Sequence, residues 1–348
     1  MKRAGLLLLL VAFIAFPQVF SNPAVTTVAV FTLLYAASAT AWNIFSGFTG
    51  YIALGHAAYI GIGSYAMALM CQDWKVPAGY TPFLLVPIAG LVAAAFAVPL
   101  GWISLRTRKH TFVVITIAIF FIMQLMAFNL RSITNGSTGL SLPNPIWSGA
   151  FFNLPFYYVS LALLVLALGV AWWIRNSKYG LGLLAIRDDE DRALGLGVRT
   201  SQSKLIAFVI STFFVGMAGA VHAYFIGSIF PAAAFDPLFD VILALMVFLG
   251  GIGTLAGPIL GALILEPAHQ FFTLQFSQNG YYLIIYGALF LIIILLLPEG
   301  IIPTLRKYWI KGTTGRGGAN NSHTRADAAK QGETLLADTT PRNDGANP

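Results

Sequence analysis

The chain has 348 residues, of which 57% are hydrophobic and only 9% charged, whereas a soluble domain carries about 25% charged residues. The net charge of +7 comes from basic residues that stand singly or in short groups. This distribution excludes the continuous basic face of a nucleic-acid-binding protein. The single cysteine, Cys71, excludes an intrachain disulfide and a thiolate metal cluster.

Long stretches without a formal charge dominate the sequence. They cover residues 4–72, 76–105, 132–174, 205–235, 241–265 and 267–298. A soluble protein could not keep such surfaces hydrated, and a charged residue at the centre of a spanning helix costs about 2.5–3.5 kcal/mol. We therefore expect an all-α, polytopic integral membrane bundle dissolved in a lipid bilayer.

The amino terminus begins with Lys2-Arg3 and an apolar run from Gly5 to Phe16, which is typical of a secretory signal peptide. No convincing small-residue cleavage site follows. We expect a retained first helix over 4–20 that bends near Pro17. Cleavage of this segment, or its use as a signal anchor, is the alternative.

Turn residues separate the remaining apolar segments into spanning helices. These are predicted near 24–45, 51–71, 82–103, 111–130, 155–174, 204–226, 238–250, 254–269 and 281–298. Together with the first helix they make about ten crossings. The segments 238–250 and 254–269 are shorter than the hydrocarbon core requires.

The basic segments set the orientation of the bundle. If Lys2-Arg3 is cytoplasmic, ten crossings place 106–109, 175–204 and 306–311 on the same side, as the positive-inside rule requires. Both termini are then cytoplasmic. The same count places the loop 131–154 outside, and it places three acidic residues at or near the outer face: Asp236, Asp240 and Glu266.

The composition changes at Gly312. Residues 312–348 are rich in Gly, Asn, Thr, Ala and charge, with only Leu335 and Leu336 as bulky apolar side chains. Such a segment cannot bury enough surface to offset the entropy of ordering. We predict a transmembrane domain over 1–311 and a disordered cytoplasmic tail over 312–348.

The segment 175–204 is the most polar part of the transmembrane domain. Asp188 is a suitable N-cap, the acidic residues after it suit the helix dipole, and Gly195 is a natural stop. The predicted short helix comprises Arg187, Asp188, Asp189, Glu190, Asp191, Arg192, Ala193, Leu194 and Gly195. A helix of two turns is marginal alone, so this one is either a solvated loop helix or a surface ordered by a partner.

Four blocks of sequence resemble the LivM-type permeases, the inner-membrane subunits of high-affinity branched-chain amino acid ABC importers. The blocks lie within residues 43–69, 134–140, 178–204 and 248–261, and they include GFTGYIALGHAA, TNGSTGL and FLGGIGTLAGPILG. The resemblance spans roughly residues 24–300. It does not fix the substrate, because related permeases are associated with urea, short amides and other small amino acids.

The resemblance implies a permease subunit that imports branched-chain or related small amino acids across a bacterial inner membrane by alternating access. The implied partners are a second permease subunit, two ATP-binding subunits and a periplasmic substrate-binding protein, with residues 187–195 docking on an ATPase. The sequence contains no G-x-x-x-x-G-K-[ST] motif, so ATP hydrolysis is expected from a separate chain. No catalytic residue, cofactor or metal is predicted. A passive channel and a polytopic enzyme are the weaker alternatives.

Two glycine pairs share one spacing, Gly47 with Gly50 and Gly250 with Gly253. Glycine-interrupted helices of transporters often end inside the protein, where freed N–H groups can face an anionic substrate group. Close helix packing is the simpler interpretation of such glycines. We name these four residues and His56 as candidates for the translocation pathway, with packing as the alternative.

The titratable residues of the apolar segments have two interpretations. His56 and His222 are either hydrogen-bonded packing residues or substrate contacts. Glu266 and His269 share one helical face, but the pair occurs once and a proline intervenes, so no metal site is predicted.

Overall fold

The computed structural model describes residues 2–20, 22–147, 149–276 and 300–305, with single positions between 284 and 295. Within these ranges the only strands are the antiparallel pair β1 (Leu140–Ser141) and β2 (Ser228–Ile229). The all-α membrane bundle is confirmed. Six described segments are long and apolar enough to span a bilayer: Pro23–Gly47, Thr81–Ser104, Lys109–Asn129, Asn153–Arg175, Thr200–Ile226 and Pro231–Gly250.

The longer helices follow one another along the chain, and shorter elements occupy several of the connections between them. They are α1 (Lys2–Val19), α2 (Pro23–Trp42), α3 (His56–Asp73), α4 (Val86–Ser104), α5 (Lys109–Asn129), α7 (Asn153–Arg175), α8 (Lys178–Asp188), α10 (Thr200–Ile226), α12 (Leu238–Gly250) and α13 (Gly257–Phe276). Shorter elements are the π-helical turn η1 (Asn43–Gly47), the 3₁₀ turns η2 (Thr81–Leu85), η3 (Gly136–Thr138) and η4 (Gly149–Phe151), and the helices α6 (Arg131–Thr134), α9 (Glu190–Gly195) and α11 (Pro231–Ala234).

Ordinary cap chemistry sets several helix ends. The Asn22 side chain accepts a hydrogen bond from the Ala24 N–H at 3.0 Å, and Pro23 occupies the first helical position of α2. A C-terminal example is α10, which is capped by Gly227. The φ of this glycine is +79°, a left-handed conformation that favours glycine.

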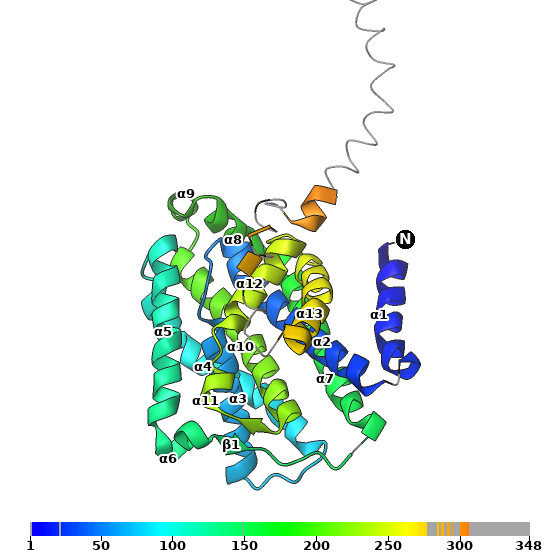
Figure 1. Ribbon diagram of the computed structural model, residues 1–348. Helices are drawn as coiled ribbons and strands as arrows, with labels where there is room; N and C mark the ends of the chain where they lie inside the picture. Colours follow the sequence, from blue (N-terminus) through cyan, green and yellow to red (C-terminus); the bar gives the residue numbers. More distant parts are fainter. Residues whose placement is uncertain are drawn as a thin grey trace, which may run out of the picture. The chain divides into compact units, whose positions relative to one another are not determined.

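Helix α10 is central to the packing of residues 1–301, with extensive contacts to α3, α4 and α2. Small residues permit the close approach: a Cβ at Gly63 would overlap the Gly216 carbonyl, and one at Gly219 would overlap the Ile60 carbonyl. Helices α5 and α1 lie at opposite edges of the bundle (Figure 1). Helices α8 and α9 lie at one end, and β1 and α6 lie at the other (Figure 1).

The structure corrects two of the predicted helix boundaries. Residues 51–55 are not helical, because the chain turns at Gly50 with a φ of +71°, and α3 begins only at His56. The segment predicted at 254–269 is α13, which has 20 residues and is therefore about 30 Å long, not a short segment. The predicted 238–250 matches α12, which has 13 residues.

Some predictions fall on residues outside the described ranges. Most of the span at 281–298 and the whole tail 312–348 belong to them, so the total of ten crossings and the disorder of the tail stay predictions. Contacts along the chain separate residues 1–301 from residues 302–348. The first of these units contains every site discussed below.

Candidate functional site

The polar segment between α7 and α10 forms two helices, not the single helix predicted. Burial of Leu183 and Ile186 orders the first of them, α8. The chain breaks at Asp189, whose extended backbone ends α8 and whose carboxylate caps α9 by accepting from the Arg192 N–H at 3.1 Å. The predicted N-cap, Asp188, is therefore wrong, and the next aspartate has that role. Arg187 and Asp188 are the last residues of α8.

The two glycine segments named from the sequence meet in space. The Asn43 side-chain amide donates to the Thr254 carbonyl at 2.8 Å, and its carbonyl oxygen accepts from the Gly253 N–H at 2.8 Å. A single asparagine thus joins η1 to the turn between α12 and α13. Because these residues are about 210 positions apart, no local pattern could have predicted the contact.

Two arginines of the segment 175–204 donate hydrogen bonds to the two glycine segments that Asn43 joins. Arg187 donates to the Gly47 carbonyl at 2.9 Å, and Arg175 donates to the Gly253 carbonyl at 3.0 Å. Gly47 is the last residue of η1, where a cation suits the partial negative charge of a helix end. We call Asn43, Gly47, Arg175, Arg187 and Gly253 the glycine junction.

The backbone donors near the glycine junction are already paired within the protein. Gly50 donates to the Ser46 carbonyl at 3.1 Å, and Gly251 donates to the Val247 carbonyl at 2.9 Å. A Cβ at Gly250 would overlap the Gly257 carbonyl oxygen. In this conformation the glycines therefore serve close packing, and their place in a translocation pathway stays a prediction.

Helix α9 is anchored by an ion pair between a buried lysine and a partly buried glutamate. Lys204 donates to one carboxylate oxygen of Glu190 at 2.5 Å and to the Tyr51 hydroxyl at 3.1 Å, while that hydroxyl donates to the other carboxylate oxygen. The Lys204 side chain is 3% exposed and that of Glu190 is 26% exposed. We call Tyr51, Glu190 and Lys204 the latch.

Charge and burial act against each other at the latch. Burial raises the pKa of the Glu190 carboxyl, but hydrogen bonds from Lys204 and Tyr51 and the charge of Lys204 outweigh it, so the pKa lies below its ordinary value. Burial and the adjacent Glu190 raise the pKa of the Tyr51 phenol. Both effects favour the state with an ionised carboxylate and a neutral phenol.

The other side of α9 faces solvent. Ala193 is buried beneath the helix, whereas Leu194 and the following Leu196 are 60% and 84% exposed. The exposed charges pair loosely: Arg192 with Asp189 at 3.0 Å, and Asp191 with Arg108 at 3.6 Å. Exposed pairs of this kind contribute little stability. Two large exposed apolar side chains, one on this short charged helix and one just after it, are the more informative feature.

A second polar group lies inside the bundle. The Asp240 carboxylate accepts from the His56 N–H at 2.9 Å and the Ala57 N–H at 3.2 Å, which are the first donors of α3. His56 Nε2 is 2.8 Å from the Ser211 hydroxyl, and no described residue is a hydrogen-bond partner of its Nδ1. We call His56, Ser211 and Asp240 the buried centre.

The prediction that Asp240 lies near the outer face is wrong. Its side chain caps the helix end opposite Asp73, about 25 Å along α3 at 1.5 Å per residue. Glu266 is likewise fully buried, ten residues into α13, where it accepts from Gln270 at 2.9 Å. An acid inside an apolar run was the signal for both. The described residues contain no cluster of three or more His, Cys, Asp or Glu side chains that could hold a metal.

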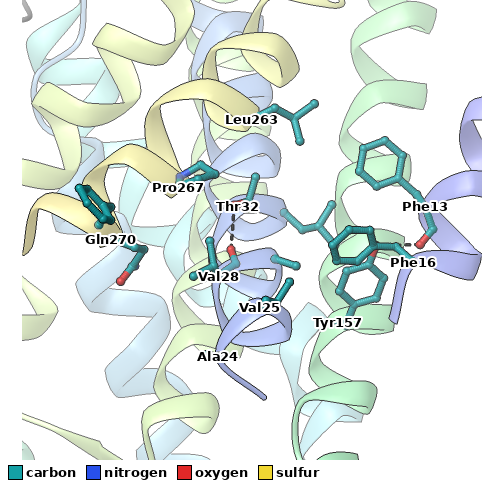
Figure 2. Close-up of a pocket in the computed structure, with 13 residues that line it drawn as sticks. Phe13, Phe16, Ala24, Val25, Val28, Thr32, Tyr157, Leu263, Pro267 and Gln270 are labelled. Carbon is teal, nitrogen blue, oxygen red and sulfur yellow. Dashed lines mark hydrogen bonds between the residues drawn. The ribbon is translucent and has the colours of Figure 1, made fainter. Parts of the chain in front are cut away.

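An apolar cavity of about 500 Å³ opens at the edge of the bundle, away from both polar groups. It lies between α1, α2, α7 and α13 (Figure 2). Its lining is mainly aliphatic and aromatic, and the Thr32 hydroxyl turns back to the Val28 carbonyl (Figure 2). The described lining residues carry no charged side chain that could pair with a zwitterionic solute.

The chain matches the family model for branched-chain amino acid transport system permease components over residues 24–294. The LivM permease protein of the high-affinity branched-chain amino acid transport system of Escherichia coli (strain K12) is 30% identical, over 88% of this chain and 76% of the relative. The LivH permease protein of the same kind of system in Salmonella typhimurium is 26% identical, over 77% of this chain and 91% of the relative.

More distant similarity extends to a sugar transporter. The ribose import permease protein RbsC of Haemophilus influenzae is 24% identical, over 62% of this chain and 68% of the relative. No solved structure matches the chain. The family match covers most of the sequence and confirms the resemblance predicted from its four blocks. The chain therefore belongs to the family of branched-chain amino acid transport system permease components.

Proposed function

We propose that this chain is a permease subunit of an ATP-driven importer that carries branched-chain or related small amino acids across a bacterial inner membrane. A periplasmic binding protein delivers the amino acid. Two ATP-binding subunits and a second permease subunit complete the assembly. Residues 106–109, 175–204 and the carboxyl end face the cytoplasm in this arrangement.

The observation that carries the proposal is the two-sided construction of α9. Its inner side is fixed by Glu190 and Ala193, and its outer side exposes Leu194 and, just beyond the helix, Leu196. A helix of six residues is not stable alone. Holding one in place while apolar side chains stand in water suits a docking surface, here for an ATP-binding subunit.

The translocation pathway in this proposal passes the glycine junction and the buried centre. Gly47, Gly50, Gly250, Gly253 and His56 line it. No lysine or arginine of the described residues lies in the middle of a predicted span, so backbone donors at the helix breaks supply the partners for a substrate carboxylate there. When α12 moves relative to η1, these backbone N–H groups leave their present carbonyl and side-chain acceptors and donate to the substrate carboxylate instead.

The test is uptake by the assembled complex in lipid vesicles. Radiolabelled L-leucine should enter only with ATP and binding protein present. Uptake of leucine without ATP would favour a passive channel. ATP-dependent uptake of urea or acetamide without leucine would assign the chain to the related amide permeases.

A pair of variants tests the docking surface itself. Leu196→Asp should remove the ATP-binding subunits from the purified complex, because an ionised side chain would be buried in the interface. Ile146→Asp is the matched control, since Ile146 is 77% exposed in the loop before α7. It should retain the ATP-binding subunits. Equal retention by both variants would refute docking through α9.

A further inference from the structure

One face of α10 connects the latch to the buried centre. Lys204, Phe208 and Ser211 are separated by four and three residues, so they lie along the same side of the helix. Lys204 binds Glu190 of α9, and Ser211 binds His56 of α3. Between them, the Phe208 ring lies 5.5 Å from the His56 ring.

Buried aromatic rings run parallel to this face. The Tyr51 ring contacts the Phe112 ring edge-on with centroids 5.5 Å apart, and Phe112 in turn lies 6.3 Å from Phe208. All three side chains are at most 2% exposed. Tightly packed interiors transmit a displacement because they cannot deform continuously.

At Ser211, this face of α10 contacts the N-terminal end of α3, which in turn contacts the N-terminal end of α12. His56 begins α3, and its N–H is held by Asp240 in the first turn of α12. Helix α10 itself is continuous over 27 residues. Contacts thus connect α9 to the ends of α3 and α12 through one continuous helix and a few side chains.

We propose that the α10 face formed by Lys204, Phe208 and Ser211 is the mechanical link between α9 and the buried centre. This inference rests on the proposed docking of an ATP-binding subunit on α9. Lys204 and Phe208 are positioning residues: neither meets substrate or nucleotide, and each fixes how movement of α9 is passed to α3 and α12.

The ion pair is the testable part of the link. A buried pair contributes little net stability compared with apolar residues of the same size, whereas removing one partner leaves an uncompensated charge. Lys204→Met removes the cation and leaves Glu190 unpaired. The double variant Glu190→Gln with Lys204→Met removes both charges, which separates loss of stability from loss of transmission.

The experiment measures ATP hydrolysis by the complete complex in vesicles, with and without binding protein and L-leucine. Lys204→Met should keep the ATP-binding subunits but lower the leucine-stimulated increase about tenfold, within the usual range of coupling between sites. Lys178→Met is the matched control, because Lys178 is an exposed residue at the start of α8. It should behave like the wild type.

The double variant decides between two explanations. If the ion pair transmits movement, the double variant should regain the thermal stability of the wild type while its stimulation stays low. Recovery of both stability and stimulation would overturn the proposal, since charge balance alone would then suffice. Normal stimulation in Lys204→Met would overturn it as well.

A second pair of variants leaves every charge in place. Phe208→Leu removes the ring between the latch and His56 and should also lower stimulation. Phe213→Leu makes the same change on another part of α10 and should not, because Phe213 packs near Gly90 of α4. Equal stimulation in the two variants would overturn the link.

The two proposals fail in different ways. Retention of the ATP-binding subunits by Leu196→Asp, or uptake without ATP, would count against the proposed function. If only the proposed link is wrong, docking and ATP-dependent uptake would still be observed as expected. The sole contrary result would be normal leucine-stimulated ATP hydrolysis in the Lys204 and Phe208 variants.

Discussion

The latch and the buried centre each contain a carboxylate, partly buried at Glu190 and fully buried at Asp240, and they stabilise it by different means. Glu190 has a lysine and a phenol, and part of its side chain reaches solvent. Asp240 is sealed and pairs instead with the N–H groups that begin α3, and no described residue forms a salt bridge with it. The ion pair can be opened from the surface, whereas the helix cap can change only if two spanning segments move.

Asp240→Ala should have the largest effect on stability. It leaves two donors of α3 without acceptors inside the bundle, at a cost of about 2–3 kcal/mol. Asp240→Asn keeps one acceptor oxygen and should lose about half as much. The measurement is the unfolding midpoint in a mixed-detergent titration. Equal losses in both variants would mean that the carboxylate does not act as a cap.

The latch should respond to pH through the carboxylate of Glu190. The pKa of Glu190 in the folded protein lies below its ordinary value of 4.5. Its stabilising contribution is therefore complete above pH 4.5 and is lost as the pH falls through the lowered pKa. Pepsin cleavage next to Leu194 and Leu196 should increase over that interval.

Glu190→Gln provides the control for the pH experiment. Its cleavage near α9 should vary with pH only as the activity of pepsin itself does. A pH profile identical to that of the wild type would show that another group controls the release of α9.

Arg187→Lys should have a smaller effect, about 1 kcal/mol, through loss of the hydrogen bond to the Gly47 carbonyl. A lysine ammonium does not reproduce the planar guanidinium that fits between the two glycine segments. Arg199→Lys, at an exposed arginine, is the matched control. Unfolding in the same detergent titration compares them, and equal midpoints would remove Arg187 from the glycine junction.

Cysteine labelling perturbs the protein least and tests on which side of the membrane the latch lies. In a Cys71→Ser background, Ser137→Cys should react with an impermeant maleimide in intact cells. Ser201→Cys, next to the latch, should react only after the membrane is opened. Both positions are exposed. Labelling of residue 201 from outside would invert the topology and place the latch on the periplasmic side.

Much of the fold was predictable because lipid imposes a simple rule on sequence. Apolar runs bounded by turn residues placed α12 at its observed bounds, and the charged residues between two such runs located the polar segment that forms α8 and α9. The finer errors have local causes. Two adjacent aspartates are equally good caps by type, and only the burial of Ile186 carries α8 on to Asp188.

The contacts that define the site were not predictable in the same way. Asn43 meets Gly253 across 210 positions, and Lys204 meets Tyr51 across 153. Nothing in one sequence encodes such distances. In the sequence, Tyr51 is not distinguished from the other residues of its apolar segment. Lys204 is not distinguished from the other basic residues of the segment 175–204. The acid at Asp240 carried a signal, since charge within an apolar run needs a partner.

The exposed leucines beside α9 also bear on how the protein is made. If an ATP-binding subunit docks on Leu194 and Leu196 as proposed, the newly inserted permease displays, until then, a patch that chaperones and proteases recognise. Its lifetime in the cell is then set by the supply of its partner. A permease made in excess should be degraded, which keeps the subunits in proportion without a separate control on their synthesis.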